Sequence, residues 1–196
     1  DDPHDNASLA IDGDGHLWVF ISGRGRGRPG FKYRSVKPYD IAAFEQIAEE
    51  EFTYPQPVWI AGKGFLHCFT KYTKGSELYW NRSADGRDWT PDQKLAGMGG
   101  HYQNTEARNG TVYTCFNYHP GGTVDKRTNL YFLQTQDLGE TWTTVTGEKI
   151  EPPLTDKHNP ALVRDFESEG RLVYLKDMLF DADGNPVMLV ITSKHH

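Results

Sequence analysis

The sequence is poor in the features that mark several classes of protein. It has only two cysteines, Cys68 and Cys115, and both lie in apolar strand patterns, which indicates buried free thiols. No apolar run is long enough to span a membrane, so we expect no membrane partner. Positive charge is also scarce: the net charge is −6 and no long basic run occurs, so nucleic-acid binding is not indicated.

Aromatic residues, glycine and proline are, by contrast, well represented. Aromatics make up 13% of the chain, which also holds 20 glycines and 11 prolines. This composition favours many short strands joined by tight turns. A hydrophobic content of 37% suits sheets with one solvated face, and 196 residues are enough for one sizeable domain. We therefore expect an all-β protein.

One short stretch organises the rest of the sequence. Residues 135–142 read Thr-Gln-Asp-Leu-Gly-Glu-Thr-Trp, and residues 83–89 read Ser-Ala-Asp-Gly-Arg-Asp-Trp. Each copy follows an aromatic strand pattern. Because Asp bonds its own backbone and Gly accepts positive φ, each copy predicts a hairpin turn that the returning Trp covers. Asp-Gly turns are common in β proteins, but two such copies about 50 residues apart favour an internal repeat.

Four units of this period can be aligned along the chain, and we expect three or four strands in each. First strands are expected near residues 4–9, 54–58, 101–105 and 158–162, second strands near 17–20, 65–69, 112–116 and 172–175, and third strands near 31–35, 78–81, 130–133 and 187–191. The fourth strands are less regular. Residues 41–47 fit a helical turn by spacing alone, whereas the repeat favours an edge strand near 44–47. Four strands per unit predict propeller blades.

The two hairpin stretches resemble the Asp-box, or BNR, repeat of sialidase-like β-propellers. The copy at 135–142 matches fully, and the copy at 83–89 is one residue shorter between Asp and Trp. We expect blades at about residues 1–50, 51–98, 99–152 and 153–196, the last one incomplete. A small β-sandwich, the other fold considered, does not explain the repeat.

A more specific resemblance rests on longer segments. Residues 2–9 with 17–23, and residues 116–120 with 127–131, resemble the BNR-4 family, which includes seven-bladed propellers and, among them, ulvan lyases and related uronate-cleaving polysaccharide lyases. The resemblance implies a β-propeller fragment of about four four-stranded antiparallel blades from a seven-bladed parent. The start of the chain, which has neither Met nor a signal-peptide pattern, also indicates a fragment.

Blade topology predicts where a site forms. The start of each first strand and the end of each second strand share one face, and the first strand is innermost. Residues at those positions therefore ring the mouth of the central channel: His4, Asn6, Tyr54, Gln56, His101, Tyr102, Asn104, His158 and Asn159, with Arg24, Arg26, Lys71, Tyr72, Asn117, Tyr118, His119, Lys176 and Asp177. Strand ends are often simply polar, but so many His, Tyr, Arg and amide side chains favour a binding or catalytic mouth.

The kinds of side chain in this ring favour one chemistry. Glycoside hydrolysis needs a pair of carboxylates, and no pair stands out among Asp5, Glu106, Asp125 and Asp177. Elimination across a uronate needs a cation or amide on the carboxylate, a base for the C5 proton, and an acid for the leaving oxygen. The ring supplies all three.

The family resemblance implies roles for some of these residues. It places a catalytic base or acid at His4, with Tyr72, Tyr118 and His119 as further catalytic candidates. Some of the lyases carry a second His about 20 residues after the first, at the end of the second strand, where this chain has the stretch at residues 22–29. Arg24 could take over carboxylate binding there, but the departure puts ulvan specificity in doubt or marks a non-lyase branch. The substrate-binding candidates are Asn6, Arg24, His101, Tyr102, Arg127, His158 and Lys176, of which Arg127 is either a carboxylate neutraliser or a structural partner.

Two other sequence features have simpler interpretations. The Gly-Arg repeat at residues 23–28 is followed by no helix, so it is not a phosphate-binding loop, and we interpret it as a cationic loop for an acidic sugar polymer or as a plain solvated loop. The loops at residues 12–15 and 181–184 lack the following Glu of a calcium loop. We expect hairpin turns there, and neither a metal nor a cofactor.

Three functions are therefore considered. The first is cleavage of an acidic, uronate-containing polysaccharide by β-elimination. The second is a sialidase-like glycoside hydrolase, and the third is a non-catalytic propeller that binds carbohydrate or protein. For the first, we expect an acidic polysaccharide or oligosaccharide as partner, a monomer at full length, and a secreted or periplasmic location inferred from the substrate class.

Overall fold

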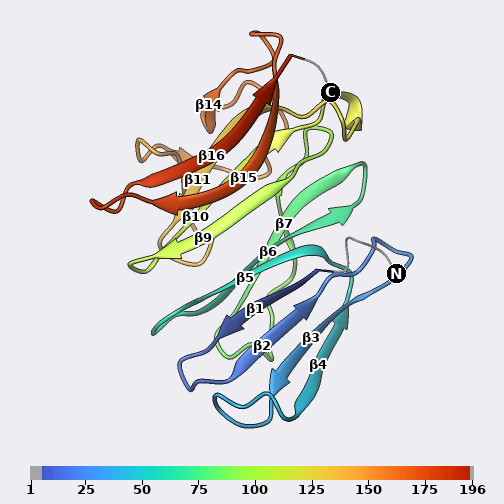
Figure 1. Cartoon of the computed structure of the whole chain (residues 1–196), viewed down its shortest axis with the longest axis vertical. Coiled ribbons are helices and arrows are strands. Elements are labelled where there is room, and N and C mark those ends of the chain that lie inside the picture. Colours follow the sequence, from blue (N-terminus) through green and yellow to red (C-terminus); the bar gives the residue numbers. More distant parts are fainter. Residues whose placement is uncertain (1–5, 195–196) are drawn as a thin grey trace. The chain divides into compact units, whose positions relative to one another are not determined.

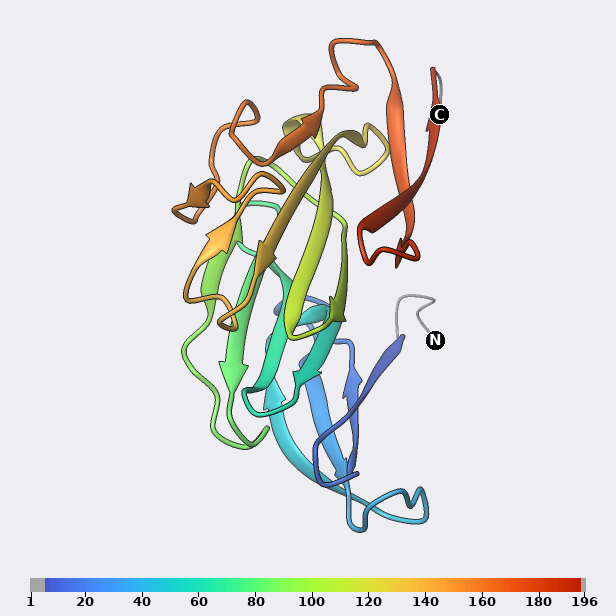
Figure 2. The ribbon, with the colours of Figure 1, turned by 90° about the vertical axis from the view of Figure 1, so that its left-hand side faces the viewer.

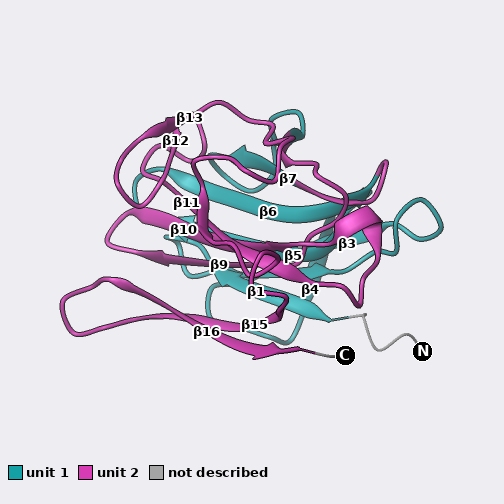
Figure 3. Ribbon diagram, turned by 90° about the horizontal axis from the view of Figure 1, so that it is seen from above, with its two compact units in different colours: residues 1–72, 79–93 teal, residues 73–78, 94–196 magenta. Residues whose placement is uncertain are grey.

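The computed structural model describes residues 6–194, and its regular secondary structure is almost entirely antiparallel strands (Figure 1). This confirms the predicted all-β class. The chain divides into two compact units: unit 1 holds residues 1–72 and 79–93, and unit 2 holds residues 73–78 and 94–196 (Figure 3). Within the described residues, no helix has the length and apolar character needed to cross a membrane.

The first sheet contains the strands predicted for the first unit of the sequence. It contains strands β1 (Ala7–Ile11), β2 (Leu17–Ile21), β3 (Gly30–Ser35) and β4 (Phe44–Glu50), hydrogen-bonded in that order. Neighbouring strands run antiparallel, so the chain passes up and down across the sheet. β4 also decides between the two interpretations of residues 41–47, because Phe44 pairs with Ser35 as an edge strand and no helical turn forms.

The second sheet has the same order. Strands β5 (Thr53–Ile60), β6 (Gly64–Tyr72), β7 (Ser76–Ser83) and β8 (Gln93–Ala96) follow one another across it. The boundary between the two units passes through β7 and the start of β8. β6 is the most buried strand of this sheet, with seven consecutive buried residues from its start.

The third sheet has the same antiparallel order, but two short strands follow its third strand. Strands β9 (Gln103–Arg108), β10 (Thr111–Tyr118) and β11 (Thr128–Thr135) pair antiparallel, and β12 (Trp142–Thr143) and β13 (Lys149–Ile150) complete one side. The short turn η1 (Pro120–Gly122) lies in the connection between β10 and β11.

The last part of the chain differs from the sequence prediction. Residues 158–162 do not begin a new sheet: β14 (Leu162–Arg164) pairs with β11 of the third sheet, and the carbonyl of Ala161 accepts the Phe132 N–H at 2.9 Å. β15 (Leu172–Phe180) and β16 (Pro186–Ser193) then form a two-stranded sheet of their own (Figure 2).

This difference shifts the last repeat by one strand. β15 packs against β9 of the third sheet, just as β5 packs against β1 within unit 1. β15 therefore takes the place of a first strand, where the sequence prediction had a second one. The sequence pattern of residues 158–162 predicts the first strand of a new sheet, whereas β14 pairs with the preceding sheet.

Each unit has its own apolar core. In unit 1 the rings of Trp18, Phe20, Phe52, Phe65 and Phe69 cluster, with Trp18 and Phe65 edge to face at 5.2 Å between ring centroids. Such aromatic contacts contribute beyond the buried area alone.

In unit 2 the core is formed by Cys115, Leu130, Phe132, Phe166, Val173 and Met178. Both cysteines of the chain are buried thiols that form no disulfide, as predicted, and burial raises the pKa of Cys115 to about 12.

The two predicted hairpin turns have closely similar hydrogen bonds. The Thr135 hydroxyl accepts the Gly139 N–H at 2.8 Å, and the Ser83 hydroxyl accepts the Gly86 N–H at 2.7 Å. An Asp carboxylate, that of Asp137 or Asp85, accepts a following backbone N–H at 2.8 Å in each turn. Both turns are therefore closed by side chains, as their sequences predicted.

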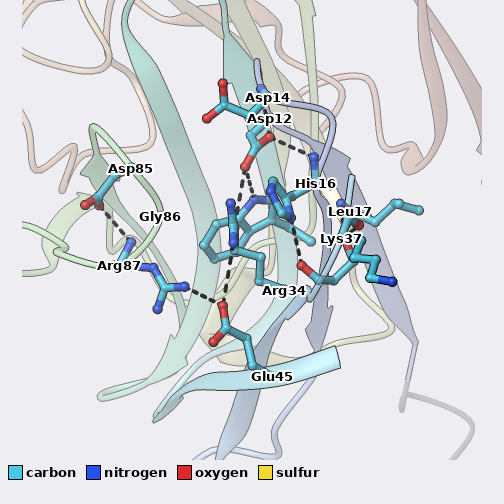
Figure 4. A network of polar contacts seen from close by, with 12 residues as sticks. Asp12, Asp14, His16, Leu17, Arg34, Lys37, Glu45, Asp85, Gly86 and Arg87 are labelled. Atoms are coloured by element: carbon cyan, nitrogen blue, oxygen red, sulfur yellow. Dashed lines mark hydrogen bonds and ion pairs between the residues drawn. The ribbon is translucent and has the colours of Figure 1, made fainter. Parts of the chain in front are cut away.

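A polar network in unit 1 joins three separate loops and strands (Figure 4). Asp12 accepts the backbone N–H groups of Asp14 and His16 at 3.0 and 2.9 Å, and its second oxygen accepts the indole N–H of Trp18 at 2.9 Å. Arg34 lies 3.7 Å from the same carboxylate and 3.6 Å from Glu45, which Arg87 also contacts. The network fixes the β1–β2 turn over the core and uses all the carboxylate's acceptors, so we interpret it as structural.

Candidate functional site

In unit 1, the Gly-Arg repeat forms a tight turn after β2. Arg24 and Arg28 form an antiparallel bridge, with the Arg24 N–H 2.8 Å from the Arg28 carbonyl. Gly25 donates its N–H to the Thr53 hydroxyl at 3.2 Å. Its φ is +53°, and a Cβ here would lie 3.1 Å from the Tyr72 ring, so a larger residue would strain the backbone and displace that ring. The repeat thus brings Arg24 beside Tyr72.

Arg24 lies between two tyrosine hydroxyls. Its Nη1 is 3.3 Å from the hydroxyl of Tyr54, near the start of β5, and 3.3 Å from the hydroxyl of Tyr72, at the end of β6. The Tyr54 backbone is held in a left-handed conformation, φ 52°, with its N–H on the Ser22 hydroxyl at 3.1 Å. These are strand-start and strand-end positions, where the sequence predicted functional side chains. We call Arg24, Tyr54 and Tyr72 the tyrosine group.

The tyrosine group has a definite hydrogen-bond polarity. A guanidinium only donates, so the Tyr72 hydroxyl oxygen accepts from Arg24. No acceptor for the Tyr72 hydroxyl proton is present within residues 6–194. Tyr72 is half-buried, and its O–H is therefore available to donate to a bound molecule.

The remaining predicted residues of unit 1 contribute less. His4 lies outside the described residues. Asn6 is exposed, and its carbonyl accepts the Ser22 N–H at 3.4 Å. Its role as a substrate-binding residue stays a prediction.

Unit 2 contains a second group, centred on Arg127 just before β11. The guanidinium carbon lies 4.5 Å from the ring centroid of Tyr102 and 4.9 Å from that of Tyr174, so each of two aromatic rings makes a cation–π contact with it. Its Nε donates to the Val124 carbonyl at 2.8 Å. Among the described residues Arg127 forms no ion pair, which leaves its two terminal nitrogens for an anion. We call Tyr102, Arg127 and Tyr174 the arginine stack.

Asn117 holds one ring of this stack in place. Its side-chain oxygen accepts the Tyr102 N–H at 2.8 Å, and its own N–H bonds the Tyr102 carbonyl at 3.1 Å. Tyr118, the next residue, ends β10 and is half-buried. Its predicted catalytic role is not tested by this geometry.

His119 is fully buried, which was not expected of a catalytic histidine. Its ring lies 5.0 Å from that of Tyr102, and neither ring nitrogen has a hydrogen-bond partner in the described part of the chain. Burial lowers the pKa of His119 to about 3, helped by the charges of His101 and Arg127. The neutral ring packs behind Tyr102, so direct proton transfer to substrate from His119 is not supported.

His101 is likewise a buried histidine, and both its nitrogens bond the backbone. Nδ1 lies 2.8 Å from the Asn117 carbonyl, and Nε2 accepts the Met98 N–H at 3.2 Å. Burial lowers its pKa to about 4, although the bond to Asn117 acts to raise it. The side chain fixes the start of β9, and its predicted contact with substrate is not supported by a ring without exposed surface.

The shift of the last repeat removes two more predicted residues from the strand ends. His158 lies in the connection between β13 and β14, exposed, with its N–H on the Asp156 carboxylate at 2.8 Å. Lys176 lies in the middle of β15, beside a bulge, and is also exposed. Neither residue lies at the strand end where the sequence analysis placed it, and their role as substrate-binding residues stays a prediction.

Because of the same shift, sequence reasoning missed residues that do lie at strand starts and ends in unit 2. Arg171 precedes β15, Tyr174 lies near its start, and Lys194 follows β16. A sequence signal for them existed: the alternating pattern of residues 172–180 is long enough for a complete strand, longer than the segment taken as a second strand. Within residues 6–194, no three His, Cys, Asp or Glu side chains are grouped to hold a metal ion.

Comparison with known proteins identifies the family and the fold. The chain matches the family model of the BNR repeat-containing family members over residues 1–196. The chain belongs to the BNR-4 family. No curated protein matches this family member in sequence.

Among solved structures, this BNR-4 chain is similar to an ulvan lyase, described as a new family of polysaccharide lyase, PL25. The structure bound to -[GlcA(1-4)Rha3S]- has a TM-score of 0.82 and the other structure 0.83, both at 17% identity. Each alignment covers 99% of this chain and 53% of that one, so the chain spans about half the length of the ulvan lyase.

An endo-1,4-beta-xylanase from Bacteroides thetaiotaomicron VPI-5482 is more distantly similar, with a TM-score of 0.51 at 10% identity, over 96% of this chain and 76% of that one. The fold is thus a β-propeller fragment with open sheets.

Proposed function

We propose that the full-length protein is carbohydrate-active and cleaves an acidic, uronate-containing polysaccharide by β-elimination. The observation that carries this proposal is the tyrosine group, in which a guanidinium donates to two tyrosine hydroxyls at 3.3 Å. None of the three residues that define this group is a carboxylate, whereas ordinary glycoside hydrolysis depends on two. The bound -[GlcA(1-4)Rha3S]- of the ulvan lyase, in which GlcA is a uronate, supports an acidic polymer as ligand.

The proposed reaction assigns a step to each group. A base removes the C5 proton of the uronate, and the family resemblance favours His4 for this role. The C–H electron pair forms the C4–C5 double bond while the bond from C4 to the glycosidic oxygen breaks. Tyr72 gives its hydroxyl proton to that leaving oxygen, since its own oxygen is already the acceptor of Arg24. The Arg24 charge stabilises negative charge that develops nearby.

The test is a survey of substrates with the full-length protein. It is incubated with a panel of uronate-containing polysaccharides while the ultraviolet absorbance of an unsaturated uronate is followed. A rise with one or more polymers is expected. New reducing ends without this absorbance would replace elimination with hydrolysis, and no product at all would favour a protein that binds without catalysis.

A second candidate function rests on a different observation, in unit 2. Burial and the nearby negative charge of Asp177 raise the pKa of Glu106, in β9. A carboxyl with a raised pKa beside an ionised one is the pattern of a hydrolase acid and its partner. For a glycoside hydrolase of this kind, Glu106→Gln abolishes the release of reducing ends; for the elimination proposed above, it leaves the absorbance assay unchanged.

Several expectations for the whole protein remain part of this proposal. They are a seven-bladed propeller, a monomeric state, and a secreted or periplasmic location where a large polysaccharide is accessible. The predicted blade ranges belong here as well, with the last blade now beginning at β15.

A further inference from the structure

A cavity of about 540 Å³ lies in unit 2 and belongs to none of the groups described above. It is lined by Pro120, Thr123, Asp125, Lys126, Thr128, Glu167, Gly170, Arg171, Leu172 and Lys194. These residues come from the β10–β11 connection, the first residue of β11, the segment before β15 with the first residue of β15, and the residue after β16. With β15 as a first strand and β16 as a second, these residues lie at or next to strand starts and strand ends, where blade topology places binding side chains.

Hydrogen bonds fix the walls of this cavity. The Thr128 hydroxyl donates to the Arg171 carbonyl at 2.9 Å, and the Val173 N–H bonds the Arg127 carbonyl at 2.8 Å. The Arg171 guanidinium is held by a neutral group, with Nη2 2.6 Å and Nε 3.3 Å from the Thr192 hydroxyl. The cavity is thus built between the starts of β11 and β15, and an arginine is oriented there without a carboxylate.

The charges in the lining leave an excess of positive groups. Three cations, Lys126, Arg171 and Lys194, face two carboxylates, Asp125 and Glu167. Glu167 is already paired with Lys157, whose Nζ lies 2.6 Å away. In the described part of the chain, none of the three lining cations forms an ion pair. An anion would gain charge-assisted hydrogen bonds here that the protein does not itself satisfy.

The remaining lining fits a sugar ring. Pro120 and Leu172 offer apolar surface, and the hydroxyls of Thr123 and Thr128 offer donors and acceptors. The volume falls within the range of roughly 300–1,000 Å³ that small-molecule sites occupy.

We propose that this cavity is a subsite for an anionic sugar unit, recognised through its carboxylate or a sulfate ester. The subsite rests on the proposed function, because it takes a unit of the same acidic polysaccharide. It serves binding rather than bond cleavage, since none of its residues belongs to the tyrosine group. Lys126 and Lys194 make the main contacts with the anionic group, and Arg171 orients it.

The test measures affinity, so that it is independent of turnover. Full-length protein carrying both Lys126→Ala and Lys194→Ala is titrated calorimetrically with chondroitin oligosaccharides and with their sulfated counterparts, which share one uronate backbone. Both lysines are exposed, so the fold is expected to be retained. The control is Lys149→Ala, which removes a lysine paired with Glu151 in unit 2, away from the cavity lining.

We expect the double variant to bind about tenfold more weakly, as the loss of a charge-assisted hydrogen bond implies, and the control to bind like the unaltered protein. A loss in both arms identifies the uronate carboxylate as the recognised group, and a loss only with sulfated chains identifies the sulfate ester. Unchanged affinity in both arms overturns the subsite. If the unaltered protein binds in a lysine-dependent way but forms no product, the subsite stands and the proposed elimination fails.

Discussion

In each unit an arginine lies among tyrosines, and the closest contacts of the two arginines differ, although the Arg24 guanidinium carbon also lies 6.0 Å from the ring centroid of Tyr72. Arg24 in unit 1 points its N–H edge at the hydroxyls of Tyr54 and Tyr72, at 3.3 Å from each. Arg127 in unit 2 instead contacts the rings of Tyr102 and Tyr174, with its guanidinium carbon at 4.5 and 4.9 Å from their centroids. The same pair of residue types therefore gives two different chemical groups.

The difference shows what each arginine can do for a substrate. Arg24 donates to the tyrosines and directs their hydroxyl protons elsewhere, which suits proton transfer. Arg127 is held flat by the rings and keeps its terminal nitrogens for an outside acceptor, which suits the planar, bidentate binding of a carboxylate. Each group is therefore interpreted within its own unit: the tyrosine group suits proton transfer, and the arginine stack suits the binding of an anion.

The largest effect is expected from Tyr72→Phe in the full-length protein. The change removes only the hydroxyl and keeps the ring against Gly25, so the fold should persist while the rate of elimination falls roughly 100-fold or more. Initial rates from the absorbance of the unsaturated product measure this. The matched control is Tyr33→Phe, which removes a hydroxyl bonded to Gln46 at 3.2 Å on the exposed face of unit 1. Equal rates for both variants would remove Tyr72 from the chemistry.

A smaller effect, on binding, is expected from Arg127. We expect both Arg127→Gln and Arg127→Lys to raise KM about tenfold with little change in kcat, because a lysine keeps the charge but not the planar donor edge. Tyr174→Phe keeps the stacking ring and should behave like the unaltered protein, whereas Tyr174→Leu should resemble the arginine variants. A lysine variant with normal KM would show that charge alone matters and that the stack has no role.

The buried histidines of unit 2 predict a pH dependence of stability. The pKa of His119 is about 3 in the folded protein, against 6.5 for the ordinary group, so between these values the unfolded chain binds a proton that the folded chain does not. Stability is therefore lost as pH falls below 6.5. Replacing His119 with Phe should reduce the loss in unfolding free energy between pH 6 and pH 4 by about 2 kcal/mol. Urea unfolding at several pH values measures it, and parallel curves for the two proteins would contradict the neutral buried state.

The smallest effect is expected in unit 1, at the Asp12 network. Burial acts to raise the pKa of Asp12, but the bonds from Trp18, His16 and Asp14 and the charge of Arg34 outweigh it and lower the pKa. The carboxylate therefore stabilises the fold above pH 3.8, and this contribution is lost as the pH falls through the lowered value.

Asp12→Asn places an amide donor against Trp18, and we expect it to cost about 1 kcal/mol at neutral pH and less in acid. Asp14→Asn is the matched control, since the exposed Asp14 joins the network through its backbone N–H. An equal loss in both variants would exclude a specific role for the Asp12 carboxylate.

Most of the fold was predictable because its periodicity is local. Alternating residues and Gly turns located the strands of the first three repeats to within a few residues, and the two Asp turns formed as their sequences indicated. The prediction failed where pairing is decided at long range. The local sequence of residues 162–164 does not indicate that they pair with β11. Because of this pairing, each later strand comes one place earlier in its repeat than predicted.

For the candidate site, too, local features were predictable from the sequence and long-range packing was not. The positions of Arg24 and Tyr72 at strand ends followed from topology, and so did that of Tyr102. Burial could not be predicted in this way. His101 and His119 are polar residues at predicted mouth positions, but His101 is buried with its ring bonded to the backbone, and His119 is buried behind Tyr102. Sequence reasoning missed Arg171, Tyr174 and Lys194. It took residues 172–175 as a second strand and 187–191 as a third, whereas β15 and β16 are the first and second strands of their sheet.

The most direct test of the central claim is mass spectrometry of the products that the full-length protein forms from a uronate polymer. Elimination through Tyr72 leaves a double bond at the new non-reducing end, so each fragment weighs one water less than the corresponding hydrolysis product. We predict these dehydrated fragments with the unaltered protein and their near absence with Tyr72→Phe. Fully hydrated fragments from the unaltered protein would contradict elimination and move the chemistry to the carboxylates Glu106 and Asp177.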